Sequence, residues 1–339
     1  NYKVVAYAYA CLIWTCTDMG RLDEAIDFAS EAEAASRVFA SEDATWSFET
    51  DQDLVRFVLS GAAIAHWFKG DCRQCRLLGD RLLDFGARAG DVNSISEGHL
   101  AHGMGCFAAG DYPAAIKKCL AAVDSSADPL YAFNARFLLA YAHLLLGDID
   151  KAEENLDAIV AFCASAGYAY IGSSAGALSS AVAVARGNLG AGIRTIGQYA
   201  RRYTAEGKHY HAQAFHYLLG SIYLKILLGE GNLSFATAIK NLPFFITQLP
   251  FAARRAKAHL QTAIRMAGEI HAFGIKGQAS LDLARLYLQQ RKPSLALPLI
   301  QESIDLFAML GADRHLARAR TVLRAVERLP AAAQDMLAD

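Results

Sequence analysis

Two stretches of the sequence decide the fold: HGMGCFAAGDYPAA at residues 102–115 and LAYAHLLLGDIDKA at residues 139–152. Each begins with an apolar run, reaches a Gly-Asp pair, and resumes with a second run that contains a small residue. Glycine ends helices readily because it takes the left-handed conformation without a Cβ penalty. The aspartate that follows can accept hydrogen bonds from the first backbone amides of the next helix. Each stretch therefore predicts two antiparallel helices joined by a tight turn.

The same turn pattern recurs along the chain. Turn glycines lie 50, 40, 37 and 40 residues apart, at Gly20, Gly70, Gly110, Gly147 and Gly187. A small residue follows each of them, at Ala25, Cys75, Ala115, Ala152 and Gly192. Upstream, the first helix of each pair has a matching small position, at Ala63, Gly103, Ala140 and Ser180. Small side chains at facing positions allow the two helices of a hairpin to approach closely.

This combination resembles the tetratricopeptide repeat, whose usual period is about 34 residues. The wider spacing predicts helices longer than standard by about a turn, with an extended linker at residues 39–47. The resemblance implies an all-α, right-handed superhelical solenoid of about seven helical hairpins with a C-terminal capping helix. We expect it to cover residues 1–329, followed by a tail at residues 330–339.

The C-terminal third continues the pattern less regularly. A first-helix signature, LGSIY at residues 219–223, is followed by an insertion at residues 229–250 instead of a turn. We expect its partner helix to run from about Phe251 to Phe273. A last pair comprises LARLY at residues 283–287 and ALPLI at residues 296–300, with residues 291–293 in place of the Gly-Asp turn. Asp313 is expected to cap a final helix.

The last repeats have a more specific resemblance, carried by AIRMAGEI at residues 263–270, KGQASLDLA at 276–284 and SIDLFAMLGAD at 303–313. They resemble the C-terminal repeats of large bacterial signal-transduction proteins. In these, an adenylate/guanylate cyclase or transcription-factor module is joined to an AAA-type ATPase and then to a tetratricopeptide tail. The resemblance implies a regulatory domain whose parent carries any catalysis upstream of Asn1. The chain also lacks an initiating Met and opens inside an apolar helical pattern, which favours a piece of a longer protein.

Composition argues against several classes of protein. The chain has 33 basic and 34 acidic side chains, whereas nucleic-acid binders usually carry a clear basic excess. No apolar run reaches the roughly 18 residues of a membrane-spanning helix, and no signal peptide is visible. Seven cysteines without framework spacing indicate a reducing compartment. We therefore predict a cytoplasmic protein that binds neither nucleic acid nor membrane.

No motif predicts catalysis, a metal or a cofactor. Cys72 and Cys75 have a metal-like spacing, but a zinc site needs two further ligands, and Cys75 occupies the small position of its repeat. The histidines form two loose groups, His99 with His102, and His209, His211 and His216. Neither group has thiolate or carboxylate ligands at a matching spacing. No convergent set of titratable residues in the sequence supports a helical enzyme.

In tetratricopeptide superhelices, certain first-helix positions face the concave side. The resemblance implies an apolar groove here, formed by Trp14, Phe57, Ile64, Trp67, Phe68, Met104, Phe107, Phe137, Tyr141, Tyr217, Ser221 and Arg285. Repeats that clamp acidic C-terminal peptides use Lys, Asn and Arg at such positions, so a carboxylate clamp is not expected. The alternative is that these side chains pack against the longer neighbouring helices.

The insertion is a second candidate surface. Its runs LPFFI at residues 242–246 and LPF at residues 249–251 are too apolar for a solvated loop. An exposed patch of this kind usually marks an interface. We expect Phe244, Phe245, Ile246 and Phe251 to dock onto the solenoid or onto a second chain.

The sequence thus predicts a non-catalytic protein-interaction and regulatory domain of a larger bacterial signal-transduction protein. Its expected partner is a protein or peptide segment held in the apolar groove, including upstream domains of the same polypeptide, and a homo-oligomer is left open. The alternative is a ligand sensor that encloses a peptide or a small amphiphile.

Overall fold

The computed structural model describes residues 2–40, 50–126, 128–167, 169–230 and 240–328. Within these ranges every regular element is a helix, so the predicted all-α fold of helical hairpins is confirmed. The chain divides into two compact units, residues 1–178 and 179–339. The boundary falls inside α9 (Ala169–Ala185). The predicted linker at residues 39–47 and the tail at residues 330–339 lie mostly or wholly outside the described residues.

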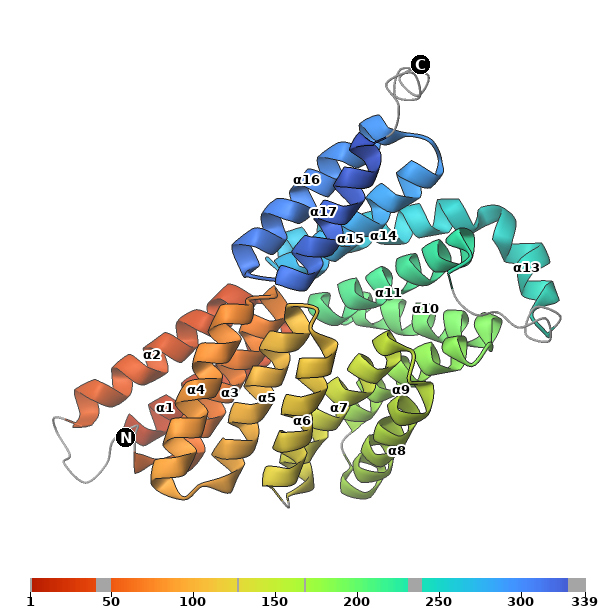
Figure 1. Cartoon of the computed structure of the whole chain (residues 1–339). Helices are drawn as coiled ribbons and strands as arrows, with labels where there is room; N and C mark the ends of the chain where they lie inside the picture. The colour runs from red at the N-terminus through yellow and green to blue at the C-terminus, as the bar shows by residue number, and fades with distance from the viewer. Residues whose placement is uncertain (1, 41–49, 127, 168, 231–239, 329–339) are drawn as a thin grey trace. The chain divides into compact units, whose positions relative to one another are not determined.

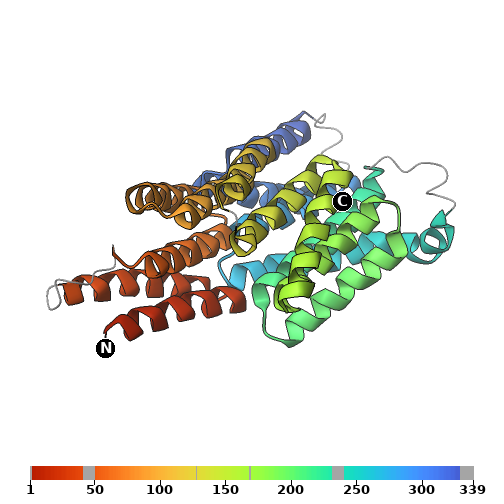
Figure 2. The ribbon, with the colours of Figure 1, turned by 90° about the horizontal axis from the view of Figure 1, so that it is seen from below.

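Unit 1 consists of antiparallel helix pairs that follow one another along the chain (Figures 1 and 2). The pairs are α1 (Tyr2–Met19) with α2 (Leu22–Ala40), α3 (Gln52–Lys69) with α4 (Cys72–Ala89), α5 (Val92–Ala108) with α6 (Tyr112–Ser125), and α7 (Pro129–Leu146) with α8 (Ile149–Ala166). The first helices also contact one another, α1 with α3, α3 with α5, and α5 with α7. The hairpins therefore stack with their first helices side by side.

The Gly-Asp turns have the predicted backbone. Gly70 and Gly147 are left-handed, with φ of 87° and 84°. Asp71 caps α4 by accepting a hydrogen bond from the Gln74 backbone amide at 3.0 Å. Asp148 makes no such cap, although the sequence pattern predicts one. Its carboxylate instead faces Lys151 at 3.2 Å and His143 at 3.4 Å.

The small positions bring the helices of each hairpin together as predicted. A Cβ built on Gly103 of α5 would lie 2.6 Å from Cys119 Sγ of α6, too close for any side chain. Cys75 of α4 is fully buried against α3, with its thiol 3.6 Å from the Ala63 carbonyl oxygen. Ala25, Ala115 and Ala152 are likewise fully buried. The core of each hairpin is thus narrow and depends on small side chains.

Unit 2 continues the hairpins beyond α9. Its elements are α10 (Leu189–Ala205), α11 (His209–Leu228), α13 (Leu242–Gln248), a short 3₁₀ helix η2 (Leu249–Phe251), α14 (Ala252–Glu269), α15 (Phe273–Gln289), α16 (Pro293–Leu310) and α17 (Asp313–Glu327). As expected, α11 pairs with α14 across the insertion, α15 pairs with α16, and α17 packs on α16. No described helix is long and apolar enough to cross a membrane.

Two predicted helix ends in unit 2 are wrong. The partner helix of the insertion ends at Glu269, not at Phe273, because His271 takes a left-handed turn with φ of 56°. Asp313 is the first residue of α17 and makes no capping hydrogen bond; the cap position belongs to Ala312. Arg291 replaces the turn glycine as expected, with φ of 58°.

Candidate functional site

The stacked first helices α3, α5 and α7 form a surface that we call the first-helix face of unit 1. Side chains three, four, seven and eleven residues apart on a helix share one face. Arg56, Ser60 and Trp67 of α3 have this spacing. Phe107 of α5 lies beside Trp67, and Tyr131 of α7 lies beside Arg56. The face therefore has a polar end, at the beginning of these helices, and an aromatic end near their last turns.

The aromatic end is a continuous row of rings, one from each helix. We call Trp67 of α3, Phe107 of α5 and Tyr141 of α7 the aromatic row. The ring centroids of Trp67 and Phe107 are 6.2 Å apart, edge to face, and those of Phe107 and Tyr141 are 5.0 Å apart. Each such pair adds about 0.5–1.5 kcal/mol beyond burial. All three side chains are half-buried, so the row keeps a surface for a further apolar group.

The row has flanking rings on both sides. Phe68 lies 5.2 Å from Trp67, and Tyr112 lies 5.3 Å from Phe107, between ring centroids. Burial, with a smaller contribution from Tyr112, raises the pKa of Tyr141 well above its ordinary value. Tyr141 is therefore neutral at physiological pH and acts as an apolar ring with one hydroxyl.

The structure brings together only some of the side chains predicted to form the groove. Trp14 of α1 meets Phe57 of α3 edge to face at 6.1 Å, and its Nε1 donates to the Phe57 carbonyl at 3.1 Å. Phe57 is 46% exposed. Ile64, Phe68 and Met104 are buried, and Phe137 is half-buried. Tyr217 and Arg285 belong to unit 2, where both are half-buried.

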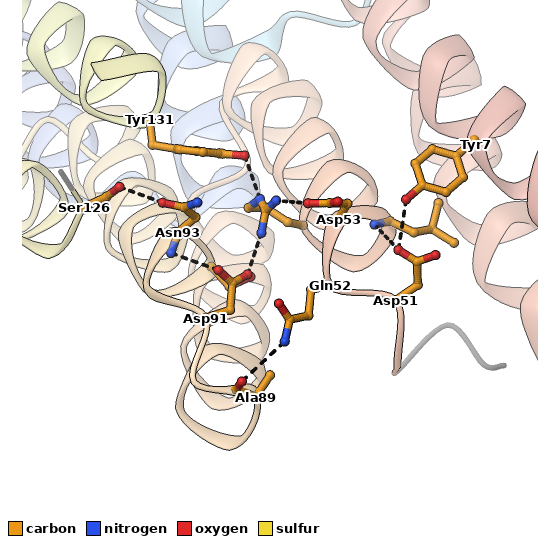
Figure 3. A network of polar contacts seen from close by, with 12 residues as sticks. Tyr7, Asp51, Gln52, Asp53, Ala89, Asp91, Asn93, Ser126 and Tyr131 are labelled. Carbon is orange, nitrogen blue, oxygen red and sulfur yellow. Dashed lines mark hydrogen bonds and ion pairs between the residues drawn. The ribbon is translucent and has the colours of Figure 1, made fainter. Parts of the chain in front are cut away.

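Sequence reasoning missed the polar end of the face, where Arg56 is the centre of a polar network. Figure 3 labels its partners Asp53, Asp91 and Tyr131. The Arg56 side chain is 8% exposed. Its Nε donates to the Tyr131 hydroxyl at 2.9 Å and its Nη1 to Asp91 Oδ2 at 2.5 Å, and its Nη2 pairs with Asp53. Arg56 thereby links α3 to the N-terminus of α5 and to the first turns of α7. A single arginine inside the apolar run LVRFVLSGAAIAHWF, residues 54–68, was the available signal.

Two carboxyl groups in this network have opposite pKa shifts. Burial pushes the pKa of Asp91 up, but the Ser94 hydroxyl and the Arg56 charge outweigh it and hold the pKa below its usual range. Glu97 lies six residues, nearly two turns, further along the chain in α5 and is only 6% exposed. Burial raises its pKa to about 7, against smaller opposing effects of Ser60 and Arg56. The network thus contains one fixed carboxylate and one carboxyl that titrates near neutral pH.

Unit 2 also carries polar groups on its first helices, α11, α15 and α17. Asp282 of α15 is 2% exposed and accepts from the Ser221 hydroxyl at 3.1 Å. Its other oxygen faces Arg285 at 3.3 Å and Arg318 at 3.4 Å. Tyr217 donates to Gln278 at 3.4 Å. Asp282 and Arg318 were not recognised from the sequence as neighbours of Arg285.

The predicted histidine groups are dispersed. His211 packs against Tyr203, with 5.3 Å between ring centroids, while His216 pairs with His259 of α14, with 3.0 Å between their Nδ1 atoms. His102 faces Asp80 at 3.0 Å. In the described part of the chain, no three histidine, cysteine or acidic side chains are grouped as metal ligands. Cys72 and Cys75 are both fully buried among apolar neighbours, as the packing interpretation expects.

The insertion folds partly onto unit 2. Asn241 is 6% exposed and holds the turn between α9 and α10: its Nδ2 donates to the Gly187 carbonyl at 2.6 Å, and its Oδ1 accepts from the Leu189 amide at 3.1 Å. Phe244 and Phe245 are half-buried and stack edge to face at 5.8 Å. Ile246 and Phe251 remain 66% and 45% exposed.

Comparisons with known proteins identify a similar fold. No protein-family model matches the sequence, and no curated protein matches it. Among solved structures, NprR in complex with its cognate peptide NprX matches with a TM-score of 0.61 at 12% identity, over 97% of this chain and 86% of that one. A Rap protein complexed with Competence and Sporulation Factor matches with a TM-score of 0.59 at 14% identity, over 94% and 80% of the two chains.

The chain is similar in fold to Rap and NprR. At this identity the likeness concerns the arrangement of helices alone. It agrees with the helical-hairpin repeats read from the sequence. It gives no support to the expected link to a cyclase or an AAA-type ATPase, since neither name refers to such an enzyme.

Proposed function

We propose that this chain is a non-catalytic, regulatory peptide-binding domain and that the first-helix face of unit 1 receives the peptide. The observation that carries the proposal is the aromatic row, three half-buried rings in contact across three successive repeats. Both similar structures hold a bound partner, NprX in NprR and Competence and Sporulation Factor in Rap, which supports a bound segment here too.

The geometry of the face suggests the length of the peptide. Arg56 and Trp67 are eleven residues apart on α3. At a rise of 1.5 Å per residue this separates the polar and aromatic ends by about 16 Å. An extended peptide advances about 3.3 Å per residue, so a segment of about five residues would reach from one end to the other.

The two ends of the face suggest the chemistry of the peptide. A large apolar side chain of the peptide would pack on Phe107, the middle ring of the row, and exclude water from it. At the other end, the Asp53 side chain is 67% exposed although its carboxylate pairs with Arg56. A basic residue or a free amino terminus of the peptide would complement that carboxylate. We therefore expect a short peptide with an aromatic or branched apolar residue about five positions from a positive charge.

The wider setting that we propose is bacterial signalling, in which the peptide is either a free messenger or a segment of a larger polypeptide. The resemblance of residues 263–313 to the C-terminal repeats of bacterial signal-transduction proteins supports this setting. The apolar surface of the insertion, with Ile246 and Phe251 exposed, offers a separate contact for a partner domain or a second copy.

Affinity selection tests the peptide proposal. The purified chain is incubated with a synthetic library of linear pentapeptides, and retained peptides are identified by mass spectrometry. We expect enrichment of peptides that combine an apolar ring with a basic residue, and loss of that enrichment in Phe107→Ala. Leu145→Ala is the matched control, since Leu145 is a 39% exposed apolar residue of α7 outside the row. Equal retention by both variants, or no enriched class, would show that the row binds no peptide.

A further inference from the structure

A cavity of about 230 Å³ lies in unit 1 between the end of α6, the first half of α7 and the middle of α8. Its origin is the length of α6, which has 14 residues where α4 and α8 each have 18. Four missing residues shorten α6 by about 6 Å relative to these second helices. The space that a further turn of α6 would fill is therefore open beside α7, which packs against both α6 and α8.

Most of the side chains around this cavity are apolar, although about half of its exposed surface is polar. Val123 of α6, Phe133 of α7, and Ile159 and Phe162 of α8 line it, together with smaller side chains. Arg136 of α7 is the one charged residue in the lining. A half-open cavity with apolar side chains and a single cation in its lining matches a ligand that has an apolar body and one negative group.

Arg136 has unused hydrogen-bonding capacity. A guanidinium carries five N–H donors and stays charged at any physiological pH. Arg136 is half-buried, yet its Nη1 makes one long hydrogen bond, 3.5 Å to Asn155 Oδ1. Within the described residues no carboxylate lies at ion-pair distance from it, whereas Arg56 of the same unit pairs with both Asp53 and Asp91. A partly desolvated charge without a counter-charge is unfavourable, and an anionic ligand would compensate it.

We propose that this cavity binds a small amphipathic carboxylate. The carboxylate would accept hydrogen bonds from the Arg136 guanidinium, and the apolar body would lie against Phe133, Ile159 and Phe162. An engineered apolar cavity of about 150 Å³ in another protein holds benzene, so about 230 Å³ accommodates roughly nine non-hydrogen atoms. Benzoate has this size and shape. The proposal is independent of peptide binding on the first-helix face.

Titration of the whole chain with benzoate, followed by protein-observed NMR and calorimetry, tests the proposal. For a ligand of this size we expect saturable binding of one equivalent, with a dissociation constant on the order of 1 mM. Benzamide has the same shape without the charge, so we expect it to bind about tenfold more weakly. Shifts confined to α6, α7 and α8 are part of the expected result. No saturable binding, or equal affinity for benzoate and benzamide, would overturn the proposal.

Two variants identify the site. Arg136→Gln removes the charge and should weaken benzoate binding about tenfold while leaving benzamide binding unchanged. Arg73→Gln is the matched control, because Arg73 is an exposed arginine of α4 far from the cavity lining. Ala158→Phe places a ring in the cavity and should abolish binding of both ligands; Ala158 is exposed, so the chain tolerates the larger side chain. Should Arg136→Gln fail to fold, Ala158→Phe decides: undiminished benzoate binding in that variant contradicts the proposal.

Discussion

The two units use the same helical hairpins, but the carboxyl and imidazole groups whose pKa burial shifts most are of opposite kinds. Unit 1 buries an ionic network around Arg56, with Glu97 beside it. Unit 2 buries the imidazole ring of His315 of α17, which stacks on Phe307 at 5.2 Å, and half-buries His259 of α14 against His216 at 5.2 Å. Burial favours the neutral forms of Glu97, His259 and His315. The same physical effect therefore shifts the pKa in opposite directions in the two units.

This difference has a consequence for how each unit responds to its surroundings. Burial raises the pKa of Glu97 from 4.5 to about 7 and lowers the pKa of His315 from 6.5 to about 4, with Arg318 adding to the second shift. Unit 1 accordingly contains a group that resists losing a proton, and unit 2 contains groups that resist gaining one. The comparison also separates a network with a buried ion pair at its centre, Arg56 with Asp91, from one that includes a half-exposed arginine, Arg318.

The largest expected effect is loss of the buried charge in unit 1. Arg56→Gln should lower the free energy of unfolding by about 3–5 kcal/mol, because Asp91 is left buried without its counter-charge. Arg318→Gln is the matched change in unit 2, and we expect it to lower the free energy by less than about 1 kcal/mol. Arg318 is 48% exposed, and Asp282 keeps Arg285 and Ser221 as partners.

Urea unfolding of the two variants measures this difference. Parallel monitoring of amide exchange in α5 and α17 assigns the loss to its unit. Equal destabilisation by the two substitutions would contradict the distinction between the buried and the half-exposed network.

The second expected effect is an opposite pH dependence of the two units. Between pH 4.5 and about 7 the folded chain retains a proton on Glu97 that the unfolded chain has lost, so stability falls as the pH rises. Between pH 6.5 and about 4, His315 is protonated in the unfolded chain but stays neutral in the folded chain, so stability falls as the pH is lowered. Each shift corresponds to at most about 3 kcal/mol.

Two substitutions isolate these contributions. Glu97→Gln should flatten the loss of stability above pH 4.5 in unit 1, and His315→Phe should flatten the loss below pH 6.5 in unit 2 while keeping the stack on Phe307. Amide exchange in each unit, measured from pH 4 to pH 8, reports the two slopes separately. A slope that persists after its substitution would assign the pH dependence to other groups.

The sequence was sufficient to predict the hairpins because their signals are local. Turn glycines such as Gly70, and small positions such as Ala115, act within one or two turns of a single hairpin. Asp148 shows where such local reasoning ends: the residue type is right for a cap, but Lys151 and His143 compete for its carboxylate. Similarly, the left-handed backbone conformation of His271, which ends a helix, could not be predicted from its residue type.

The candidate site was only half predictable. Trp67 and Phe107 were found because each lies three residues before its turn glycine, and stacking brings equivalent positions together. Tyr141, six residues before Gly147, lies about one turn earlier in the next repeat. Arg56 was missed because its partners Asp91 and Tyr131 come from other repeats at non-equivalent positions. The cavity at Arg136 was missed for a different reason: it depends on α6 being shorter than its neighbours, and helix ends are read poorly from sequence.

A smaller effect concerns the insertion in unit 2. Asn241→Ala removes two hydrogen bonds to the turn between α9 and α10 and should lower stability by about 1–2 kcal/mol. It should also speed proteolysis within residues 240–251. Gln248→Ala is the control, because Gln248 bonds only its neighbour Thr247 in an exposed position. Equal proteolysis of the two variants would mean that Asn241 does not hold the insertion in place.

The smallest expected effect concerns the cysteine pair of unit 1. Cys75→Ala with Cys72→Ala should change stability by less than about 1 kcal/mol, since alanine fills the same small position in other hairpins, including Ala256 in unit 2. Circular dichroism melting gives the stability, and elemental analysis gives the zinc content. One equivalent of zinc in the parent protein, lost together with stability in the double variant, would contradict a packing role.

The most direct test of peptide binding on the first-helix face uses Trp67 as the reporter. In a chain carrying Trp14→Phe and Trp46→Phe, Trp67 is the one remaining tryptophan. Its emission and its quenching by acrylamide are followed while the tightest pentapeptide from the library is added. We predict a saturable emission shift and reduced quenching at the concentrations that give binding by calorimetry, both abolished by Phe107→Ala. Full calorimetric binding with an unchanged Trp67 signal, and undiminished by Phe107→Ala, would contradict a peptide site at the aromatic row.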